Sequence, residues 1–537
     1  MVDFNLADLF EVVAGAVPDR TAVVAADTRL TYAALDERAN RLASHLEAAG
    51  VGPGDHVGVY SYDRAEWIEA MLAAFKLRAV PINVNYRYVE DELAYLFDNA
   101  DLVALVFEAG FTPRVAAVRS GLPDLATLVV LDDGSGLDAA AEGAVPYEDA
   151  LAAGSPDRPV GDRSADDHYV LYTGGTTGLP KGTIWRHEDI FFAALQGGNP
   201  GGDPVARPEQ VAAAADRAPG VYLVCPPLMH GGGQWAALIA LLSGGTVVLD
   251  VNRPFDPVAA WRLVEQEQVN SMMVVGDAMA RPLADALADA LAAPGAAYDT
   301  SSLLAVGSGG AILSPAVKDE LRRLLPGVFV IDSFGASETG HNGSVLDLDG
   351  PAAGPRFQVN DSTAVLGDDG RPVAPGSGVV GRLARRGHIP LGYHKDPEKT
   401  AATFLEVDGV RWVVPGDAAV VEEDGTVLVL GRGSMCINTG GEKVYPEEVE
   451  AALKSHPDVF DALVVGVPDE RFTERVAAVV RPRDGRAPTL EELATHCRRT
   501  LAGYKVPRSL VLRDEVARTP VGKPDYRWAK DVATAGR

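Results

Sequence analysis

Cysteine and positive charge are both scarce in this chain. Its 537 residues include 3 cysteines, Cys225, Cys436 and Cys497, which lie far apart and lack the spacing of metal ligands. A disulfide framework is therefore not expected, and a reduced, cytoplasmic compartment fits best. Lysine and arginine number 48 against 75 aspartates and glutamates, which gives a net charge of −27. Such a surface repels nucleic acids and anionic membranes, so neither is an expected partner.

Long apolar runs are also missing. The chain begins M-V-D-F-N-L-A-D-L-F, without the basic segment and apolar run of a signal peptide. The most apolar stretch, 235–249, is interrupted by Ser243, Gly244 and Gly245 and is too short to span a bilayer. We expect a buried helix followed by a strand there, and no membrane span. With 47% hydrophobic and 23% charged residues, the composition is that of a large globular enzyme with more than one domain.

The first part of the chain alternates between helix and strand patterns. Thr31 is a candidate N-cap for a helix that ends near Gly50. Further on, the pattern predicts strands at 56–60, 80–84 and 102–107, and helices at 64–77 and 90–99. This alternation predicts parallel βαβ units with helices on both sheet faces. A polar stretch at 132–167 is expected to separate this lobe from a second one at 168–330, in which 196–217 reads as a surface loop.

A loop rich in glycine and threonine, Y-T-G-G-T-T-G-L-P-K-G at 172–182, has the composition of a phosphate-binding loop. Glycines let backbone N–H groups approach an anion, threonine hydroxyls add donors, and Lys181 adds a full charge. Pro180 precedes that lysine, so the spacing is not that of a Walker A loop. The alternative for an isolated loop of this kind is a surface turn. The candidate phosphate contacts are Thr173, Gly174, Gly175, Thr176, Thr177, Gly178 and Lys181.

Two further segments follow apolar, strand-like runs. They are G-S-G-G-A-I-L at 307–313 and I-D-S-F-G-A-S-E-T-G at 331–340, so both are expected at strand carboxyl ends, where open α/β sheets bind ligands. Asp332 could accept a hydrogen bond from an adenine amino group, and Phe334 could stack on the base. Glu338 is a hard oxygen ligand suited to Mg²⁺. The remaining candidates of this nucleotide half are Ser308, Gly309, Gly310, Gly335 and Ser337.

A third motif, P-P-L-M-H-G-G-G-Q-W at 226–235, combines a histidine with a glycine run and a tryptophan. The residues alone favour a loop histidine that caps the following helix. By contrast, G-S-G-V-V-G at 376–381 matches a dinucleotide fingerprint only by chance, because Pro375 precedes it and no βαβ unit surrounds it.

In this order, the motifs resemble those of the adenylate-forming superfamily, which includes acyl-CoA synthetases, peptide-synthetase adenylation domains and luciferases. The resemblance covers nearly the whole chain and includes W-V-V-P-G-D at 412–417 and R-T-P-V-G-K-P-D-Y-R at 518–527. The run 431–450, with W-R-H-E-D at 185–189, looks most like actinobacterial synthetases for steroid side-chain, polycyclic or long-chain acids. The resemblance implies a catalytic role for Lys523, with Glu338 and Lys181. It implies ribose contacts from Asp417 and Arg432, an acyl pocket with His230, Gly233, Gln234 and Trp235, a CoA loop with Gly440, Gly441 and Glu442, and a hinge at Ser434.

The expected fold is α/β. A large N-terminal domain, 1–432, would comprise two stacked βαβ-type subdomains plus a β-rich subdomain. A small mobile α+β domain, 433–537, would carry the catalytic lysine and the CoA loop. The cofactors implied by the resemblance are ATP (leaving as AMP), Mg²⁺ and coenzyme A, and the enzyme would be an AMP-forming acid–thiol ligase. A homodimer is left open.

Several positions depart from the family pattern. Gly174 stands where serine is usual, Ser337 where threonine is usual, and Asn438 where lysine is usual. One alternative is therefore an enzyme that mainly transfers an acyl group from a preformed acyl-adenylate to CoA. Others are a luciferase-like oxygenase, an enzyme that acylates a carrier protein, or a non-catalytic nucleotide sensor. The third motif lacks the aspartate that holds a substrate amine, which argues against an amino acid substrate.

Overall fold

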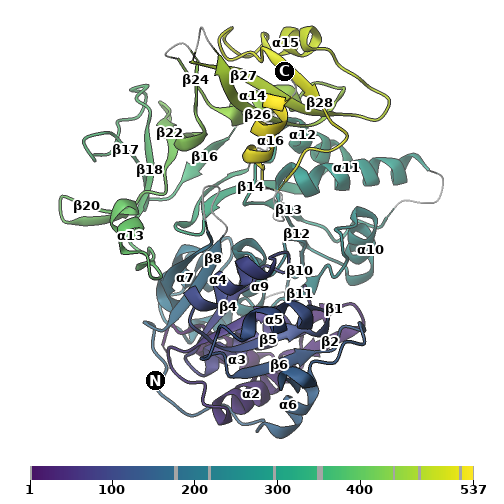
Figure 1. Cartoon of the computed structure of the whole chain (residues 1–537), viewed down its shortest axis with the longest axis vertical. Helices are drawn as coiled ribbons and strands as arrows, with labels where there is room; N and C mark the ends of the chain where they lie inside the picture. The colour runs from purple at the N-terminus through teal and green to yellow at the C-terminus, as the bar shows by residue number, and fades with distance from the viewer. Residues whose placement is uncertain are drawn as a thin grey trace.

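The computed structural model describes residues 3–173, 179–215, 219–293, 298–346, 355–439, 442–469, 473–518 and 523–535. Figure 1 shows the N-terminal half in purple and blue at the bottom, a teal region above it, a green β-rich arm and a yellow C-terminal domain at the top. This arrangement confirms the expected α/β architecture, with a large N-terminal part and a smaller C-terminal one.

The first subdomain is built on a five-stranded parallel sheet with the order β4-β3-β5-β6-β7. Its strands are β3 (His56–Tyr60), β4 (Val80–Asn83), β5 (Leu102–Glu108), β6 (Thr127–Leu131) and β7 (Val145–Pro146). Its helices are α3 (Ala65–Lys76), α4 (Glu90–Asn99), α5 (Thr112–Arg119) and α6 (Tyr147–Ala153). The expected strands and helices are confirmed. The polar stretch at 132–167, expected to separate this lobe from the phosphate loop, contains β7 and α6, which complete this subdomain.

The second subdomain continues a long sheet whose order begins β2-β1-β11-β10-β12-β13-β14-β15. Its strands are β1 (Thr21–Ala25), β2 (Thr28–Thr31), β10 (Val221–Val224), β11 (Thr246–Leu249), β12 (Ser271–Val274), β13 (Ala305–Ser308), β14 (Phe329–Ala336) and β15 (Gly340–Leu346). Strands β1 and β2 come from the N-terminal part of the chain, yet β1 pairs with β11, with Val23 opposite Val247, and β2 pairs with β1 at the edge of the sheet. The helices are α9 (Gly231–Leu242), α10 (Pro257–Glu267), α11 (Gly276–Ala292) and α12 (Pro315–Leu324).

A three-stranded antiparallel sheet lies between these parts and carries the phosphate-loop hairpin. It consists of β8 (His168–Thr173), β9 (Lys181–Arg186) and β19 (Gly392–Tyr393), followed after β9 by α7 (His187–Ala193). The expected surface loop at 196–217 includes α8 (Gln210–Ala215), whose Val211 and Ala215 are buried. The segment is therefore more than the expected surface loop, because these two side chains belong to the core that α1 (Leu6–Ala16) also lines.

The β-rich arm extends the long sheet through antiparallel strands. It contains β16 (Arg356–Val359), β17 (Thr363–Leu366), β18 (Gly381–Arg386), β20 (Phe404–Val407), β21 (Val410–Val413), β22 (Asp417–Val421), β23 (Val427–Arg432) and the helix α13 (Pro397–Thr403). Gly381, the last glycine of G-S-G-V-V-G, begins β18, which pairs antiparallel with β17 and β22. This setting confirms that the segment is no dinucleotide fingerprint.

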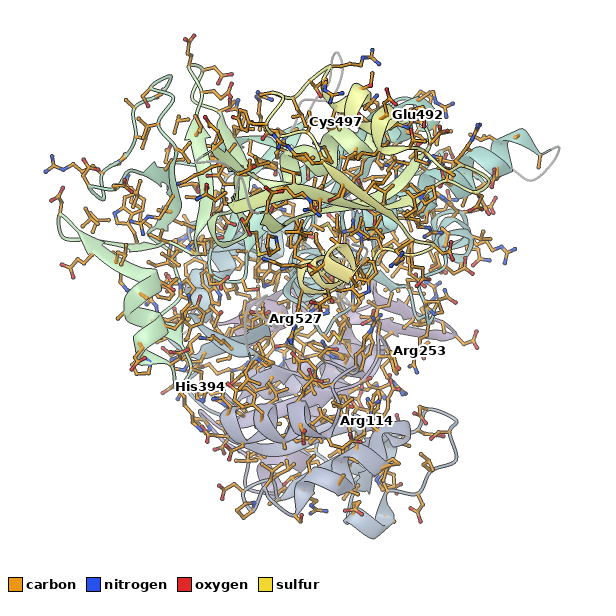
Figure 2. All side chains as sticks on the ribbon, turned by 45° about the horizontal axis from the view of Figure 1, so that its top comes forward. Arg114, Arg253, His394, Glu492, Cys497 and Arg527 are labelled. Carbon is orange, nitrogen blue, oxygen red and sulfur yellow. The ribbon has the colours of Figure 1, made fainter. Side chains whose placement is uncertain are left out.

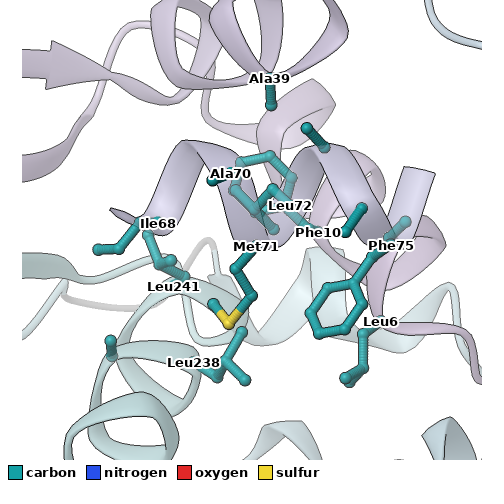
Figure 3. Close-up of a cluster of buried hydrophobic side chains, with 14 of the residues drawn as sticks. Leu6, Phe10, Ala39, Ile68, Ala70, Met71, Leu72, Phe75, Leu238 and Leu241 are labelled. Atoms are coloured by element: carbon teal, nitrogen blue, oxygen red, sulfur yellow. The ribbon is translucent and has the colours of Figure 1, made fainter. Parts of the chain in front are cut away.

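Apolar side chains from four helices join the two subdomains. α2 (Tyr32–Ala48) begins after its N-cap Thr31, whose side chain accepts a hydrogen bond from Ala34 N, as the sequence predicts. The helix ends at Ala48, and Ala49 is its C-cap residue. Figure 3 shows Met71 and Phe75 of α3 facing Leu238 of α9 and Leu6 of α1. Each fully buried side chain of this size contributes about 1.5–3 kcal/mol relative to an exposed one. The core therefore fixes α9, which carries the third motif, against the first subdomain.

The C-terminal residues form a separate five-stranded sheet with three helices. The elements are β24 (Ile437–Thr439), β25 (Glu442–Val444), β26 (Val459–Asp469), β27 (Thr473–Pro482), β28 (Ser509–Leu512), α14 (Pro446–Lys454), α15 (Leu490–Cys497) and α16 (Tyr526–Ala535). Pro446 takes the first helical position of α14, as expected. In Figure 1 this yellow domain lies over the teal α11 and α12. Across the described segments, no helix is both long and apolar enough to cross a bilayer.

Candidate active site

The phosphate-loop hairpin places Lys181 beside two residues that the sequence motifs did not identify. Thr173 ends β8 directly opposite Lys181, which begins β9. The ammonium of Lys181 forms an ion pair of 2.5 Å with Asp396 and lies over the Tyr393 ring, 5.9 Å from its centroid. The other five predicted phosphate contacts, Gly174, Gly175, Thr176, Thr177 and Gly178, lie outside the described residues.

Tyr393 connects Lys181 to the predicted metal ligand. Its hydroxyl donates a hydrogen bond of 2.9 Å to Glu338 Oε1, and its backbone N donates one of 2.9 Å to the Thr400 hydroxyl. Tyr393 therefore lies next to both Glu338, through its hydroxyl, and Lys181, through its ring. The signal for Tyr393 and Asp396 was the run L-G-Y-H-K-D-P at 391–397, where an aromatic residue ends a two-residue strand and several charges follow it.

Asn83 ties the hairpin to the third motif. Its side-chain amide donates to the carbonyls of Tyr172, at 2.8 Å, and Met229, at 2.7 Å. Its Oδ1 accepts from Tyr172 N at 2.8 Å. Asn83 is buried at the carboxyl end of β4. One amide from the first subdomain thus fixes the spacing between the entry to the phosphate loop and the residue that precedes His230.

Three buried polar atoms on the first turns of α9 have no hydrogen-bond partner among the described residues. They are His230 Nε2, Gln234 Nε2 and Trp235 Nε1. His230 precedes the first residue of α9, but its side chain makes no capping bond within the part of the chain that the structure describes. The interpretation as a capping histidine is therefore wrong. Since buried polar groups are almost always paired, this cluster is suited to receive a ligand.

The other predicted members of this pocket have structural partners. Gln234 Oε1 accepts a hydrogen bond of 2.7 Å from the Tyr169 hydroxyl. A Cβ at Gly233 would lie 2.5 Å from the carbonyl oxygens of both Pro226 and Pro227, so helix packing alone requires glycine there. A ligand contact from Gly233 stays a prediction.

Lys523, expected to be catalytic, acts on this cluster from the C-terminal domain. Burial is the main cause that lowers the pKa of His230 to about 3, and the positive charges of Lys523 and Arg87 contribute to this shift. Like charges influence a histidine in this way only when they lie nearby. Lys523 is exposed, and its charge acts on His230, which stays neutral at physiological pH.

The nucleotide half lies at the carboxyl ends of β13 and β14, as expected. Gly310 adopts φ +81° and faces open space, which leaves room for a ligand. Three predicted contacts are engaged elsewhere: Ser308 Oγ accepts from Gly276 N at 3.0 Å, Asp332 forms a 2.7 Å ion pair with Lys318, and Phe334 packs on Phe357. Their ligand roles stay predictions.

The remaining glycines and serine of this half serve the fold at least in part. A Cβ at Gly335 would lie 2.1 Å from the Gly340 carbonyl oxygen in the β14–β15 hairpin, and one at Gly309 would contact Met273 at 3.1 Å. Ser337 offers its carbonyl to Trp185 Nε1 at 2.9 Å. These contacts account for glycine at 335 and 309 without a ligand, while the Ser337 contact uses only its backbone, so none of them tests a nucleotide role.

The ribose candidates lie at the end of the β-rich arm, and the hinge and CoA candidates lie at the start of the C-terminal domain. Asp417 begins β22 directly opposite Arg432 at the end of β23, so the two expected ribose partners are cross-strand neighbours. Ser434 lies in a short helical turn, and Glu442 begins β25 with an exposed side chain. Gly440 and Gly441 lie outside the described residues.

A cavity of about 280 Å³ opens next to the third motif, between the two subdomains. Arg253 covers the Tyr62 ring at 3.5 Å and pairs with Glu108 at 3.1 Å, and Tyr62 stacks on Tyr86. In Figure 2, Arg253 lies on the large N-terminal half, below the yellow domain. The cavity is lined by Tyr62, Asp63, Tyr86, Arg87, Cys225, Pro227, Asp250, Val251, Asn252, Arg253, Pro254, Phe255 and Met279.

Burial raises the pKa of Asp63 in this cavity to about 7, and Asp63 Oδ1 accepts from Leu228 N at 2.8 Å. This hydrogen bond joins the cavity wall to the loop that carries His230. Arg87 both lines the cavity and lowers the pKa of His230. The cavity and the His230 cluster are therefore neighbouring parts of one region.

Two family models match the chain: AMP-binding enzyme over residues 10–394, and AMP-binding enzyme C-terminal domain over 448–523. Solved structures agree in fold. The anthranilate CoA ligase AuaEII in complex with anthranoyl-AMP aligns with a TM-score of 0.84 at 22% identity, covering 100% of this chain and 98% of that one. ATP-bound MatB from Rhodopseudomonas palustris aligns with a TM-score of 0.81 at 25% identity, covering 98% of each chain.

Curated relatives are similar over almost their full length. A 3-oxocholest-4-en-26-oate–CoA ligase of Rhodococcus rhodochrous is 53% identical, covering 98% of this chain and 95% of the relative. A medium/long-chain-fatty-acid–CoA/3-oxocholest-4-en-26-oate–CoA ligase of Mycolicibacterium smegmatis is 52% identical, covering 98% and 96%. These findings confirm the expected enzyme class, an AMP-forming acid–thiol ligase that uses ATP and CoA. The chain belongs to the AMP-binding enzyme family, within the adenylate-forming acyl-CoA synthetases.

Proposed function

We propose that this enzyme forms a CoA thioester from a bulky hydrophobic carboxylic acid, of the steroid side-chain or long-chain type, through an acyl-adenylate. The observation that carries the proposal is the position of Lys523, whose charge reaches the buried His230 cluster. The acid's carboxylate would lie between that ammonium and the unpartnered donors of α9. The names of the relatives, which act on such acids, support a large acyl group.

The chain's own residues would position the reactants and stabilise developing charge. Lys523 would bridge the substrate carboxylate and the α-phosphate of ATP, which favours attack and the departure of pyrophosphate. Lys181 would exchange its pairing with Asp396 for a phosphate oxygen. Asp417 and Arg432 would hold the ribose. The neutral state of His230 keeps a third positive charge out of the site and allows its ring to donate or accept a hydrogen bond.

Glu338 would hold Mg²⁺ together with the ATP phosphates. The ion prefers oxygen ligands and is commonly bound by one or two carboxylates plus substrate phosphates, so a single glutamate fits. No group of three metal-ligating side chains gathers among the described residues, which agrees with an ion that arrives with its nucleotide. Bound there, Mg²⁺ would neutralise charge on the departing pyrophosphate. Tyr393 would orient the glutamate for that role.

The second half-reaction would use the domain formed by residues 433–537. Gly440, Gly441 and Glu442 would contact the pantetheine of CoA, and Ser434 would serve as the hinge between the two reactions. We also propose a cytoplasmic location, because free cysteines suit a reducing compartment. A homodimer, if present, would appear in sedimentation analysis.

Lys523→Ala tests this function through two separate assays with 3-oxocholest-4-en-26-oate. Loss of one aimed charge is expected to slow ATP–pyrophosphate exchange by about 10²–10³-fold. Transfer from the synthetic acyl-adenylate to CoA should change far less. Lys530→Ala is the matched control, because that lysine lies in the same domain and faces Glu474 at 3.7 Å. An equal loss in both assays would refute the role of Lys523.

The second candidate, an enzyme that mainly transfers a preformed acyl group, rests on the substitutions at Gly174 and Ser337. The same exchange assay separates it from the synthetase. Robust exchange by the unmodified enzyme excludes the transferase, whereas CoA acylation without exchange supports it.

A further inference from the structure

Helix α11 carries a charged stripe that faces the C-terminal domain. Asp277, Arg281 and Asp285 are spaced four residues apart, so they project from one face of the helix. Asp277 and Arg281 are buried, and Asp285 is half-buried. We name these three residues the α11 stripe.

The C-terminal domain meets each member of the α11 stripe with a complementary group. Lys454 Nζ lies 3.7 Å from Asp277 Oδ2, and Arg483 Nη1 donates a hydrogen bond of 3.3 Å to Asp285 Oδ1. Between them, the Arg281 guanidinium faces the ring of Phe460 at 5.8 Å. Arg481 covers the same ring at 4.2 Å. Negative, positive and negative groups on the helix thus oppose positive, aromatic and positive groups on the domain.

Some buried polar atoms of the α11 stripe have no hydrogen-bond partner among the described residues. Arg281 Nε and Nη2 are buried and have no hydrogen-bond partner among the residues the structure describes. Asp277 Oδ2 is likewise without a hydrogen bond in that set, although Lys454 is near. Burying charged groups in this way costs free energy. A reason to retain them is that their pairing selects one position of the domain. Such an interface favours one arrangement of the two domains by charge pattern rather than by apolar contact.

The start of helix α11 is also fixed to the nucleotide half of the site. Gly276 N donates to Ser308 Oγ at 3.0 Å, and Asp277 Oδ1 accepts from Ser314 N at 2.7 Å. Gly276 adopts φ +47°, and a Cβ there would lie 2.4 Å from the Ile312 carbonyl oxygen, so the junction requires glycine. The α11 stripe is therefore held in a defined position relative to the carboxyl end of β13.

We infer that the α11 stripe is a docking element that sets the C-terminal domain in the position where the charge of Lys523 acts on His230. Its residues contact the C-terminal domain and are not among the proposed nucleotide or acid contacts, so they are positioning residues for adenylate formation. This inference rests on the proposed function, because it assigns a consequence to the placement of Lys523. It predicts that the charge pattern determines docking. Reversing the charge on either the helix or the domain should slow adenylate formation, and reversing both charges together should be tolerated.

The test uses charge reversal at the partly exposed pair Asp285 and Arg483, where folding is least at risk. Asp285→Arg and Arg483→Asp should each slow ATP–pyrophosphate exchange with 3-oxocholest-4-en-26-oate by about tenfold, the size of a typical coupling between contacting residues. The double variant should return to within about threefold of the unmodified enzyme. Transfer from the synthetic acyl-adenylate to CoA should stay nearly unchanged in all three.

Asp289→Arg is the matched control. Asp289 lies one turn beyond Asp285 on the same helix and is exposed, so its reversal should leave both assays unchanged. Equal losses in both assays, or a double variant that folds but is not restored, would overturn the inference. Hydrogen–deuterium exchange across 276–292 supplies a readout without substrate: it should rise in each single variant and return in the double. If the unmodified enzyme shows no pyrophosphate exchange, the proposed function fails, while unchanged hydrogen exchange in the single variants refutes the docking role.

Discussion

The hydroxyl of Tyr393 donates a 2.9 Å hydrogen bond to Glu338, while the ring of Tyr393 lies beneath the ammonium of Lys181. One side chain thus contacts both the anionic and the cationic group expected to act on the triphosphate. Through Tyr393, the glutamate and the lysine belong to one connected set of contacts.

Tyr393→Phe removes the hydrogen bond and keeps the ring. A hydrogen bond to a charged group contributes about 1.5–3 kcal/mol, so adenylate formation should slow by about tenfold or more. The Mg²⁺ concentration needed for half-maximal rate should rise, since Glu338 loses its orienting partner. Steady-state pyrophosphate exchange at varied Mg²⁺ measures both effects. Tyr298→Phe, whose ring stacks on Trp261 at 6.4 Å, is the control and should change neither quantity.

Asp396→Asn frees Lys181 from its competing anion. Asp396 also caps α13 by accepting from Lys399 N at 2.9 Å, and asparagine caps a helix about equally well. The Kd of ATP, measured by calorimetry, is therefore expected to fall by about threefold or more, because a phosphate no longer displaces a carboxylate. Weaker ATP binding in this variant would instead show that Asp396 positions Lys181.

Asn83→Leu leaves the carbonyls of Tyr172 and Met229 unpaired in the interior. We expect the free energy of unfolding to fall by about 2–4 kcal/mol, since each buried unsatisfied group costs about 1–3 kcal/mol. Adenylate formation should fall by more than the loss of folded protein explains, because the phosphate loop and the His230 loop lose their common anchor. Denaturant unfolding measures the free energy of unfolding, and pyrophosphate exchange on the folded fraction measures adenylate formation. Asn85→Ala, at an exposed turn that accepts from Arg87 N, is the control.

His187 should make stability depend on pH. Its Nδ1 accepts from Leu6 N at 3.2 Å, and burial lowers its pKa to about 4. The unfolded histidine, with a pKa of about 6.5, binds a proton that the folded one rejects, so the stability contribution is present above that pH and is lost as the pH falls toward about 4. The difference in unfolding free energy between unmodified protein and His187→Asn should therefore shrink by about 1.4 kcal/mol per pH unit in this window. A pH-independent difference would contradict the assignment.

Local patterns predicted much of the fold. Strand β3 and helix α4 have the bounds that the sequence predicts, because period-two and period-3.6 patterns with clear caps determine them. The pairing of β1 with β11 was not predictable, since it joins residues more than 200 positions apart and depends on tertiary packing. The short β7 and α6 were missed because the polar stretch around them resembles a linker.

The residues of the site also divide into those that the sequence predicted and those that it did not. Glu338, Lys181 and Lys523 stand in motifs with recognisable spacing, and the structure places the first two around Tyr393 and the third near His230. Asn83 could not be found from sequence, because its role depends on carbonyls that come from two other subdomain segments. The ion pair between Asp332 and Lys318 was equally unpredictable, since a carboxylate in a motif does not show which residue it pairs with in the fold.

Strands β1 and β2 have a consequence for any attempt to divide the enzyme. They leave the first lobe, reach across, and cover the edge of β11 in the other lobe's sheet. A fragment starting at residue 168 would therefore expose that edge, and uncovered strand edges invite pairing between molecules. The two lobes therefore fold as one unit. Fragments cut at the polar stretch, 132–167, should precipitate unless residues 21–31 are supplied as a separate peptide.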